Sequence, residues 1–372
     1  MNAITEQQSL AHWPLSPEQR AVLVAAETSE SDTQQAASAQ ANVMVADIQG
    51  ALDSSRLERA LSDLRQQHEV LATALKSVAG YRGLRHQALE ELPAIEWRYE
   101  DLRGSDDQEP LLDGDLNDAL KNYSEALKLR PMAVESGELL RPALLRTGEK
   151  NWVLVLAVSA LVADRGSLQS LFSVLVEAYD QSGGADDESA LQYSQFIEWR
   201  ASLESDDDAE EGREYWQNHQ QHAEQAGACR LPARQAHRHD VRAEHEYVAL
   251  QLEPDLVARI DSLADELQVS AEAVLQAAWW ALLARISGNE CVLGGWQHDC
   301  RQDYEVMQGA LGLFDKVLPV LVEGIVDSDF SSWIARLAEQ LEAHTQAQEY
   351  WSIDALPDKR HLAAGFAFSE GV

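Results

Sequence analysis

The segment VSALVADRGS, from Val158 to Ser167, joins two stretches of different hydrophobic period. Before it lies WVLVLAV (152–158), an unbroken apolar run that is typical of a strand buried on both faces. After it, apolar side chains recur at helical spacing, which predicts a helix over 167–180 with Ser167 as its N-cap. These side chains are Leu168, Leu171, Phe172, Leu175, Val176 and Tyr179. A buried strand, a short polar turn and a helix together indicate an α/β fold.

The same two periods recur along the rest of the chain. Short apolar or alternating runs predict strands at 42–48, 246–252, 291–296 and 316–323. Apolar stripes predict a helix over 52–71, with Asp53 among its possible caps, and two helices within 255–288 that break near Val269 and Ser270, the second largely buried. The polar stretches 180–189 and 205–212 separate the two halves. We therefore expect two related α/β lobes with a boundary in that region.

Composition excludes several classes of partner. The formal net charge is −34, with 63 acidic against 29 basic residues, and this argues against nucleic acid, because phosphate binding needs a basic face. No apolar run reaches the roughly 18 residues of a membrane span, so we expect no membrane partner. The first twenty residues lack the features of a signal peptide. Cys229, Cys291 and Cys300 show no CxxC spacing, and together these features favour a cytoplasmic protein.

Other chemical signatures are weak. Five histidines form an HxxH and an HxH pattern that is compatible with zinc: His219, His222, His237, His239 and His245. Their surroundings are rich in Gln, Arg and Ala, which favours a polar surface, so we expect no metal site. The chain has neither a glycine-rich phosphate loop nor a GxSxG motif.

Several segments, taken in order, carry a more specific signal. They are LSPEQR (15–20), QHEVLAT (67–73), ELLRPALLRTGEKNWVLVLAVSALVADRGSLQSL (138–171), QYSQFIEW (192–199) with REYW (213–216), LGGWQHDCR (293–301), GLFDKVLPV (312–320) and FAFSE (366–370). In this order they resemble the motifs of the condensation domains of nonribosomal peptide synthetases. Each segment alone is weak, but together they span nearly the whole chain.

This resemblance implies a two-lobed fold of the chloramphenicol-acetyltransferase type, a V-shaped pseudo-dimer of mixed sheets with helices. It implies an N-terminal lobe over 1–185, linking helices and an acidic loop over 186–225, and a C-terminal lobe over 226–372. The chain ends soon after FAFSE, so we expect that lobe to be incomplete relative to the family. A tunnel between the lobes would admit the phosphopantetheine arms of two carrier proteins, and no bound cofactor is implied.

The chain departs from the family at its central motif. Laid on HHxxxDG, residues 159–165 read SALVADR. Ala160 stands at the second His, to which the family owes its base or its positioning of the attacking amine. Arg165 stands at the Gly that keeps the tunnel wall bare. Ser159 precedes Ala160 by one residue, so on a strand its side chain points to the opposite face and cannot take over. We interpret the motif as a degenerate active site.

Asp164 of the motif is retained. The resemblance implies that this carboxylate is structural and paired with an arginine, with Arg301 as the leading partner and Arg141 as the second. The resemblance also makes Ser167, Trp296 and Lys316 candidates for lining the tunnel.

The motif as it stands assigns no catalytic residue. His298, in GWQHDC, is a weak candidate for a substitute base, and a surface or packed histidine is the simpler interpretation.

Three functions stay open at this point. The first is a non-catalytic condensation-domain-like part of a peptide synthetase that docks carrier, adenylation or tailoring partners. The second is an active acyltransferase that condenses carrier-bound acyl or aminoacyl thioesters through non-standard residues. The third is an unrelated two-lobed acyltransferase that acts on coenzyme A esters.

Overall fold

The computed structural model describes residues 12–27, 41–103, 113–180, 191–203, 209–226, 248–288, 291–325, 329–352, 362 and 364–369. Its strands are β1 (His12–Pro14), β2 (Ala41–Gln49), β3 (Thr73–Ser77), β4 (Leu84–Ala88), β5 (Arg98–Asp101), β6 (Leu140–Arg146), β7 (Asn151–Ser159), β8 (Cys291–Asp299), β9 (Asp315–Glu323) and β10 (Gly365–Ala367). Its α-helices are α1 (Pro17–Glu27), α3 (Ser54–Gln67), α4 (Asp113–Leu129), α5 (Arg165–Asp180), α6 (Tyr193–Ser202), α7 (Ala209–Ala226), α8 (Pro254–Leu267), α9 (Ala271–Ser287) and α10 (Phe330–Gln346). Short 3-10 helices lie at Glu69–Leu71, Val134–Ser136, Cys300–Asp303, Glu305–Met307 and Gln348–Tyr350.

Internal contacts divide the chain into two compact units. Unit 1 comprises Met1–Ala201 and Arg301–Asp315, and unit 2 comprises Ser202–Cys300 and Lys316–Val372. The segment 301–315, far along the chain, thus belongs to unit 1. The lobe ranges expected from the sequence stay a prediction.

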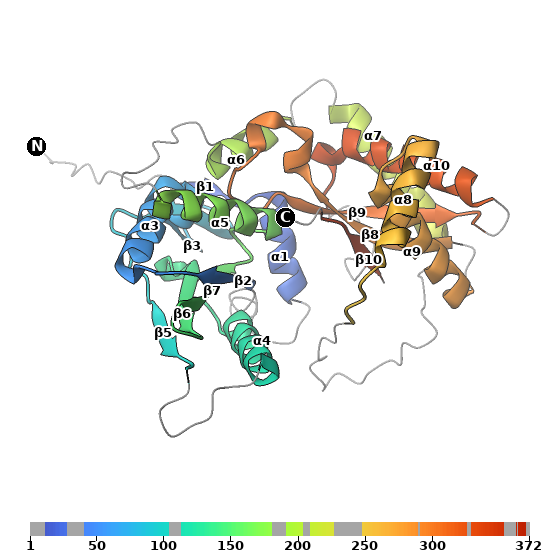
Figure 1. Cartoon of the computed structure of the whole chain (residues 1–372). Helices are drawn as coiled ribbons and strands as arrows, with labels where there is room; N and C mark the ends of the chain where they lie inside the picture. Colours follow the sequence, from blue (N-terminus) through green and yellow to red (C-terminus); the bar gives the residue numbers. More distant parts are fainter. Residues whose placement is uncertain are drawn as a thin grey trace, which may run out of the picture. The chain divides into compact units, whose positions relative to one another are not determined.

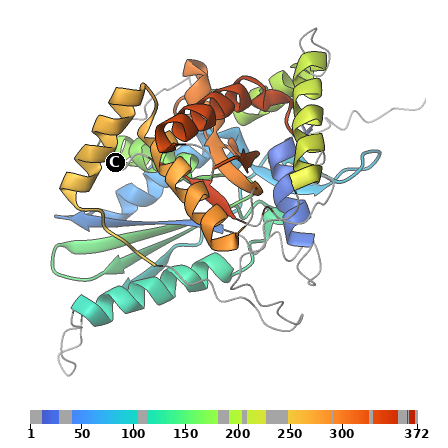
Figure 2. The same ribbon diagram turned by 90° about the vertical axis from the view of Figure 1, so that its right-hand side faces the viewer.

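Unit 1 is built on a four-stranded sheet of order β2-β7-β6-β5. Strand β7 pairs antiparallel with both neighbours, and β5 runs parallel to β6. Residues 153–159 of β7 are all buried, which confirms the central strand predicted from its unbroken apolar run. Figures 1 and 2 show α3 and α5 on one side of this sheet and α4 on the other. A smaller antiparallel sheet, β1-β4-β3, completes the unit.

Two helix starts in unit 1 show how far local sequence determines structure. Helix α3 is capped by Asp53, as expected, because the Asp53 carboxylate accepts a hydrogen bond from the Arg56 N–H at 3.1 Å. The prediction for α5 is wrong in detail. The helix starts at Arg165, and Ser167 lies within its first turn. Asp164 takes the capping position, because its carboxylate accepts from the Ser167 N–H at 2.8 Å.

Unit 2 is built on the sheet β10-β8-β9, in which β10 is parallel to β8 (Figure 1). The expected strands over 291–296 and 316–323 are confirmed as β8 and β9. Trp280 of α9 is fully buried against Gly294 of β8, where the ring occupies the space that a Cβ would need. The break between α8 and α9 is also confirmed, and it follows Gln268, whose φ of 55° is left-handed. Helix α9 is largely buried as expected, although Leu282 and Ile286 are about half exposed.

The strand expected over 246–252 is wrong for the residues that the structure describes. Residues 248–252 form no strand, and Val248 and Leu250 are 85% and 84% exposed. Glu246 and Tyr247 lie outside the described residues. Alternating apolar residues show which side chains would share a face, but a strand also needs a hydrogen-bonding neighbour, and the pattern does not supply one.

Candidate functional site: the turn after strand β7

The carboxylate of Asp164 is fully engaged inside unit 1. It is 2% exposed, and its Oδ1 accepts hydrogen bonds from the Ser167 N–H at 2.8 Å and from Arg301 Nη2 at 2.5 Å. Its Oδ2 accepts from the backbone N–H groups of Phe314 at 2.7 Å and Asp315 at 3.0 Å. One side chain thus ties the turn after β7 to the segment 312–315.

Arg301 is the partner of Asp164, as the sequence suggested. Its Nη2 also donates to Ser167 Oγ at 2.6 Å, and its Nε donates to the Ala310 carbonyl at 3.1 Å. The guanidinium lies 4.3 Å from the centre of the Phe314 ring, within range of a cation–π contact. Arg141, the second candidate, pairs with Glu138 at 2.6 Å instead.

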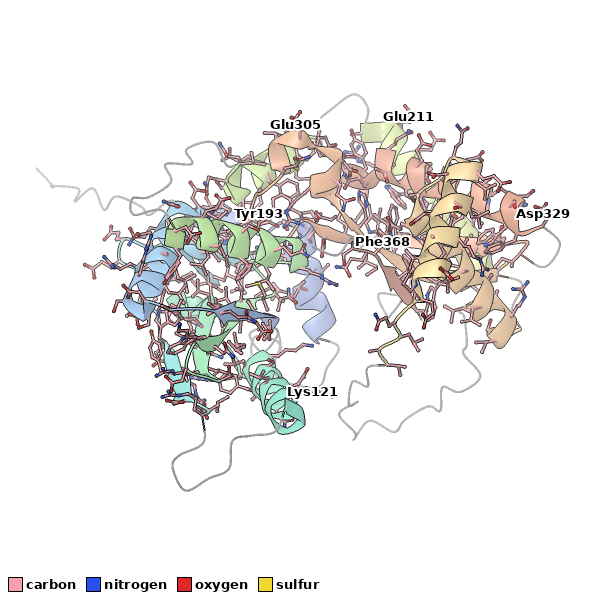
Figure 3. The ribbon with its side chains drawn as sticks, in the orientation of Figure 1. Lys121, Tyr193, Glu211, Glu305, Asp329 and Phe368 are labelled. Carbon is pink, nitrogen blue, oxygen red and sulfur yellow. The ribbon has the colours of Figure 1, made fainter. Side chains whose placement is uncertain are left out.

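Ser167 extends the same buried network. Its hydroxyl donates to the Gly312 carbonyl at 2.5 Å and accepts from the Gly312 N–H at 3.0 Å. Gly312 leaves no room for a side chain, because a Cβ there would collide with the ring of Tyr193. Tyr193, labelled in Figure 3, places its hydroxyl 2.9 Å from both Ser16 Oγ and the Leu313 carbonyl. The tunnel-lining role expected for Ser167 stays a prediction.

The LSPEQR segment also contacts the motif at 159–165, through Gln19. Ser16 and Gln19 form a capping box at the start of α1, with Gln19 N donating to Ser16 Oγ and Ser16 N donating to Gln19 Oε1. Gln19 Nε2 also donates to the Leu161 carbonyl at 2.6 Å. A buried ion pair of 3.3 Å joins Glu18 to Arg200 of α6. Of these contacts, only the capping box has a signal in the sequence, its Ser-x-x-Gln spacing, because the others join residues far apart in the chain.

The remaining motif positions are Ser159, Ala160 and Arg165, and they make few polar contacts with the residues that the structure describes. Ala160 offers a methyl group. Ser159 is fully buried, and its Oγ accepts a hydrogen bond from the Leu161 N–H at 3.4 Å. Arg165 is exposed and makes no hydrogen bond or ion pair with the described residues.

One buried histidine reaches this network in the described part of unit 1. His86 of β4 lies within hydrogen-bond distance of Gln19 and of Thr73 Oγ1, and it stacks on Trp13. Burial lowers the pKa of His86 to about 3, so the ring is neutral at pH 7. Because the ring is also completely buried, it is a structural group and a poor base.

The candidates in unit 2 are packed within that unit. Trp296 is 5% exposed and donates from Nε1 to Glu272 at 2.6 Å, and the His298 ring lies 4.7 Å from the Trp296 ring. Lys316 is 4% exposed and donates to the Gln348 side chain. Lining of a tunnel by Trp296 and Lys316 stays a prediction.

Two expectations, no metal site and no membrane span, can be compared with the structure only for the described residues. Among them, no group of three or more His, Cys, Asp or Glu side chains has the geometry to hold a metal ion. His219 and His222 lie on α7, whereas His237, His239, His245 and Cys229 fall outside the described ranges. Within those ranges, none of the helices combines the length and apolar character that crossing a bilayer requires.

Known proteins resemble this chain along most of its length. "Bacitracin synthase 3" of Bacillus licheniformis is 25% identical over 312 residues, which cover 84% of this chain and 4% of that protein. "Tyrocidine synthase 2" of Brevibacillus parabrevis is 24% identical over 294 residues, which cover 79% of this chain and 7% of that protein. The chain therefore spans a small fraction of these relatives.

Solved structures share the fold. The "first condensation domain of the calcium-dependent antibiotic synthetase in complex with substrate analogue 3a" matches with a TM-score of 0.77 at 18% identity, over 96% of this chain and 80% of that one. The "X-domain from teicoplanin biosynthesis" matches with a TM-score of 0.74 at 22% identity, over 98% of this chain and 78% of that one. The protein-family profile described as "Condensation domain" matches residues 9–353. Since that match covers most of the sequence, the chain belongs to the condensation-domain family.

Proposed function

We propose that this chain is a part of a nonribosomal peptide synthetase that has lost the usual base-assisted amide-bond chemistry and serves as a docking and structural platform. The observation that carries the proposal is the contrast within one turn. The structural contacts of Asp164 are all in place, whereas Ala160 and Arg165 stand where the family has its second histidine and its glycine.

Without the histidine, the motif lacks a group that accepts the proton of the attacking amine. An amine that attacks a thioester carbonyl must give up a proton, and a positioned imidazole with a pKa near 6.5 accepts it well. The methyl group of Ala160 accepts nothing, and Ser159 Oγ is buried and bonded elsewhere. Loss of a general base costs about 10²–10⁴ in rate. Proximity of the amine and the thioester alone would leave the condensation slow.

Arg165 adds a second obstacle. Its side chain is exposed at the position where the family keeps a bare wall, and it carries a permanent positive charge. A guanidinium there would repel an acceptor amine in its ammonium form, and it is far bulkier than the family's glycine. Ala160 and Arg165 would therefore both lower the rate of condensation.

A docking platform needs a stable structure and does not need a reactive centre. The buried contacts of Asp164, Ser167 and Gln19 keep the turn in place without any catalytic duty. The partners that fit are the carrier, adenylation or tailoring domains of a synthetase, and phosphopantetheine would arrive as the arm of a carrier. A transient contact of this kind buries less than about 1,200 Å² and has micromolar affinity.

A second candidate function, an active acyltransferase with non-standard residues, is favoured by one feature of unit 2. Burial raises the pKa of the Glu272 carboxyl, while its hydrogen bond from Trp296 and the nearby His298 oppose that shift. A carboxyl whose pKa is raised by burial beside an imidazole is the kind of pair that acid–base catalysis uses. Both also have a simpler role in packing around Trp296.

The test supplies donor and acceptor carrier proteins loaded with aminoacyl thioesters and follows the condensed product by intact-protein mass spectrometry. We expect no product above the protein-free control, together with measurable binding of a carrier, adenylation or tailoring domain in titration calorimetry. Product well above the control would overturn the platform proposal. Loss of that product in His298→Ala would then support the second candidate.

A further inference from the structure

The hairpin of β3 and β4 in unit 1 is basic, although the chain as a whole is strongly acidic. From Val70 to Leu89 the sequence contains no Asp or Glu, whereas the whole chain contains 63 of them in 372 residues. Lys76 of β3, Arg85 of β4 and Arg82 in the turn between the strands supply three positive charges within ten positions. We call these three residues the basic hairpin tip.

Strand register places two of these cations side by side and away from the core. Lys76 and Arg85 lie directly opposite each other in the antiparallel pair, and the next pair, Leu75 and His86, is fully buried. Because side chains alternate between the two faces of a sheet, Lys76 and Arg85 point to the other, outer face. Like charges directly opposite each other destabilise a sheet, and neither cation forms an ion pair with a carboxylate of the described residues. The hairpin therefore carries a local repulsion that an anionic partner would relieve.

Arg85 is held in position, and part of its guanidinium is left for a ligand. Its Nε donates to His12 Nδ1 of β1 at 3.2 Å, and its Cζ lies 4.2 Å from the centre of the Tyr81 ring. Its two Nη atoms make no hydrogen bond with a described residue. A guanidinium binds a carboxylate most strongly through two parallel N–H donors, and a side chain that is already ordered loses less entropy on binding. Tyr81 is 52% exposed and adds apolar surface beside the charges.

The spacing and the number of the charges select the partner. Side chains directly opposite in an antiparallel pair have Cβ atoms about 4.5–5.5 Å apart, which matches the roughly 5–6 Å between side chains at i and i+4 on a helix. Carboxylates with that spacing can each meet one of the two paired cations, while Arg82 meets a third. A nucleic acid or an anionic membrane extends beyond one hairpin and would also meet the acidic remainder of the molecule, whose formal net charge is −34. We propose that the basic hairpin tip is a docking surface for an acidic α-helix of a partner protein, a role that does not depend on whether the chain condenses peptides.

The experiment measures the fluorescence anisotropy of labelled peptides titrated with the full chain. The probe is an alanine-rich helical peptide with glutamates at i, i+4 and i+8, and its control carries the same glutamates at i, i+5 and i+10, spread around the helix. At about 100 mM salt the Debye length of about 10 Å screens repulsion from the rest of the molecule. We expect the probe to bind with a dissociation constant of about 0.1–1 mM and the control to bind at least about fivefold more weakly. Equal binding of the control peptide or of an oligonucleotide of the same charge, or binding by neither peptide, would refute the proposal.

Variants assign the binding to the hairpin. Lys76→Gln and Arg85→Gln should each weaken binding of the probe about twofold to fivefold, and the two changes together about tenfold. Lys121→Gln and Lys150→Gln are the matched controls, because both lysines are exposed, belong to unit 1 and make no ion pair with the described residues. Lys76→Gln should also raise the melting temperature by about 1–3 °C, since it removes the repulsion at Arg85. Hairpin variants that bind the probe like the controls, or a Lys76→Gln variant that is no more stable than wild type, would overturn the proposal.

Discussion

Replacing Asp164 by alanine should destabilise unit 1 severely. The variant leaves three backbone N–H donors without their acceptor and leaves the Arg301 guanidinium, which is 5% exposed, without its counter-ion. Breaking a buried pair by removing one partner costs about 3–5 kcal/mol. For a unit of this size each kcal/mol lowers the melting temperature by about 2–4 °C, so we expect a fall of roughly 6–20 °C.

Thermal unfolding followed by circular dichroism measures this fall. Asp63→Ala is the matched control, because Asp63 is exposed on α3 and makes no hydrogen bond or ion pair with the described residues, and its melting temperature should change little. A double-mutant cycle with Arg301→Met separates the ion pair from general damage. The double variant should be at least about 1 kcal/mol more stable than the sum of the single changes implies, because it leaves no unpaired charge. Additive losses, or an unchanged melting temperature for Asp164→Ala, would refute the structural role.

Three further predictions concern other buried residues of unit 1. Because the pKa of His86 is about 3 when folded and near 6.5 when unfolded, protonation favours the unfolded chain, and stability should fall as pH drops below 6.5. In urea unfolding between pH 6 and pH 5, His86→Gln should lower that pH dependence by about 1.4 kcal/mol per pH unit, and an unchanged slope would contradict the buried neutral ring. Gly312→Ala should lower the melting temperature of unit 1, since its methyl group meets the Tyr193 ring, and a stable variant would show that the contact is loose. Gln19→Ala should cost about 2 kcal/mol or more, because the Leu161 carbonyl and the Ser16 N–H lose their partner, and a loss below about 0.5 kcal/mol would rule out that anchoring role.

Local pattern predicted the elements of the fold well where a segment is long and periodic. The apolar run of β7, the stripe of α3 and the break between α8 and α9 all gave elements that the structure contains. The pattern failed for 248–252, where alternation alone could not identify a neighbouring strand. It also misplaced the start of α5, since Asp164 and Ser167 are both good capping residues and only the packing around Arg301 decides between them.

The site could be predicted only through the resemblance to a family. Spacing within the sequence does not reveal that Arg301 lies beside Asp164, because the two are 137 positions apart and the segment 301–315 returns to unit 1. The contacts of Gln19 with the Leu161 carbonyl and of Glu18 with Arg200 carry no signal at short range either.

The most direct test of the proposed loss of chemistry measures the rate of condensation for four forms of the chain: wild type, Ala160→His, Arg165→Gly and the double variant. Each receives the same loaded donor and acceptor carriers, whose binding is established first by calorimetry. We expect no product above the protein-free control from wild type or from Ala160→His alone, because Arg165 still places a bulky cation where the family has glycine, and we expect product from the double variant. Turnover by wild type well above the control, at a rate that neither substitution changes, would contradict the conclusion that the motif has lost its function.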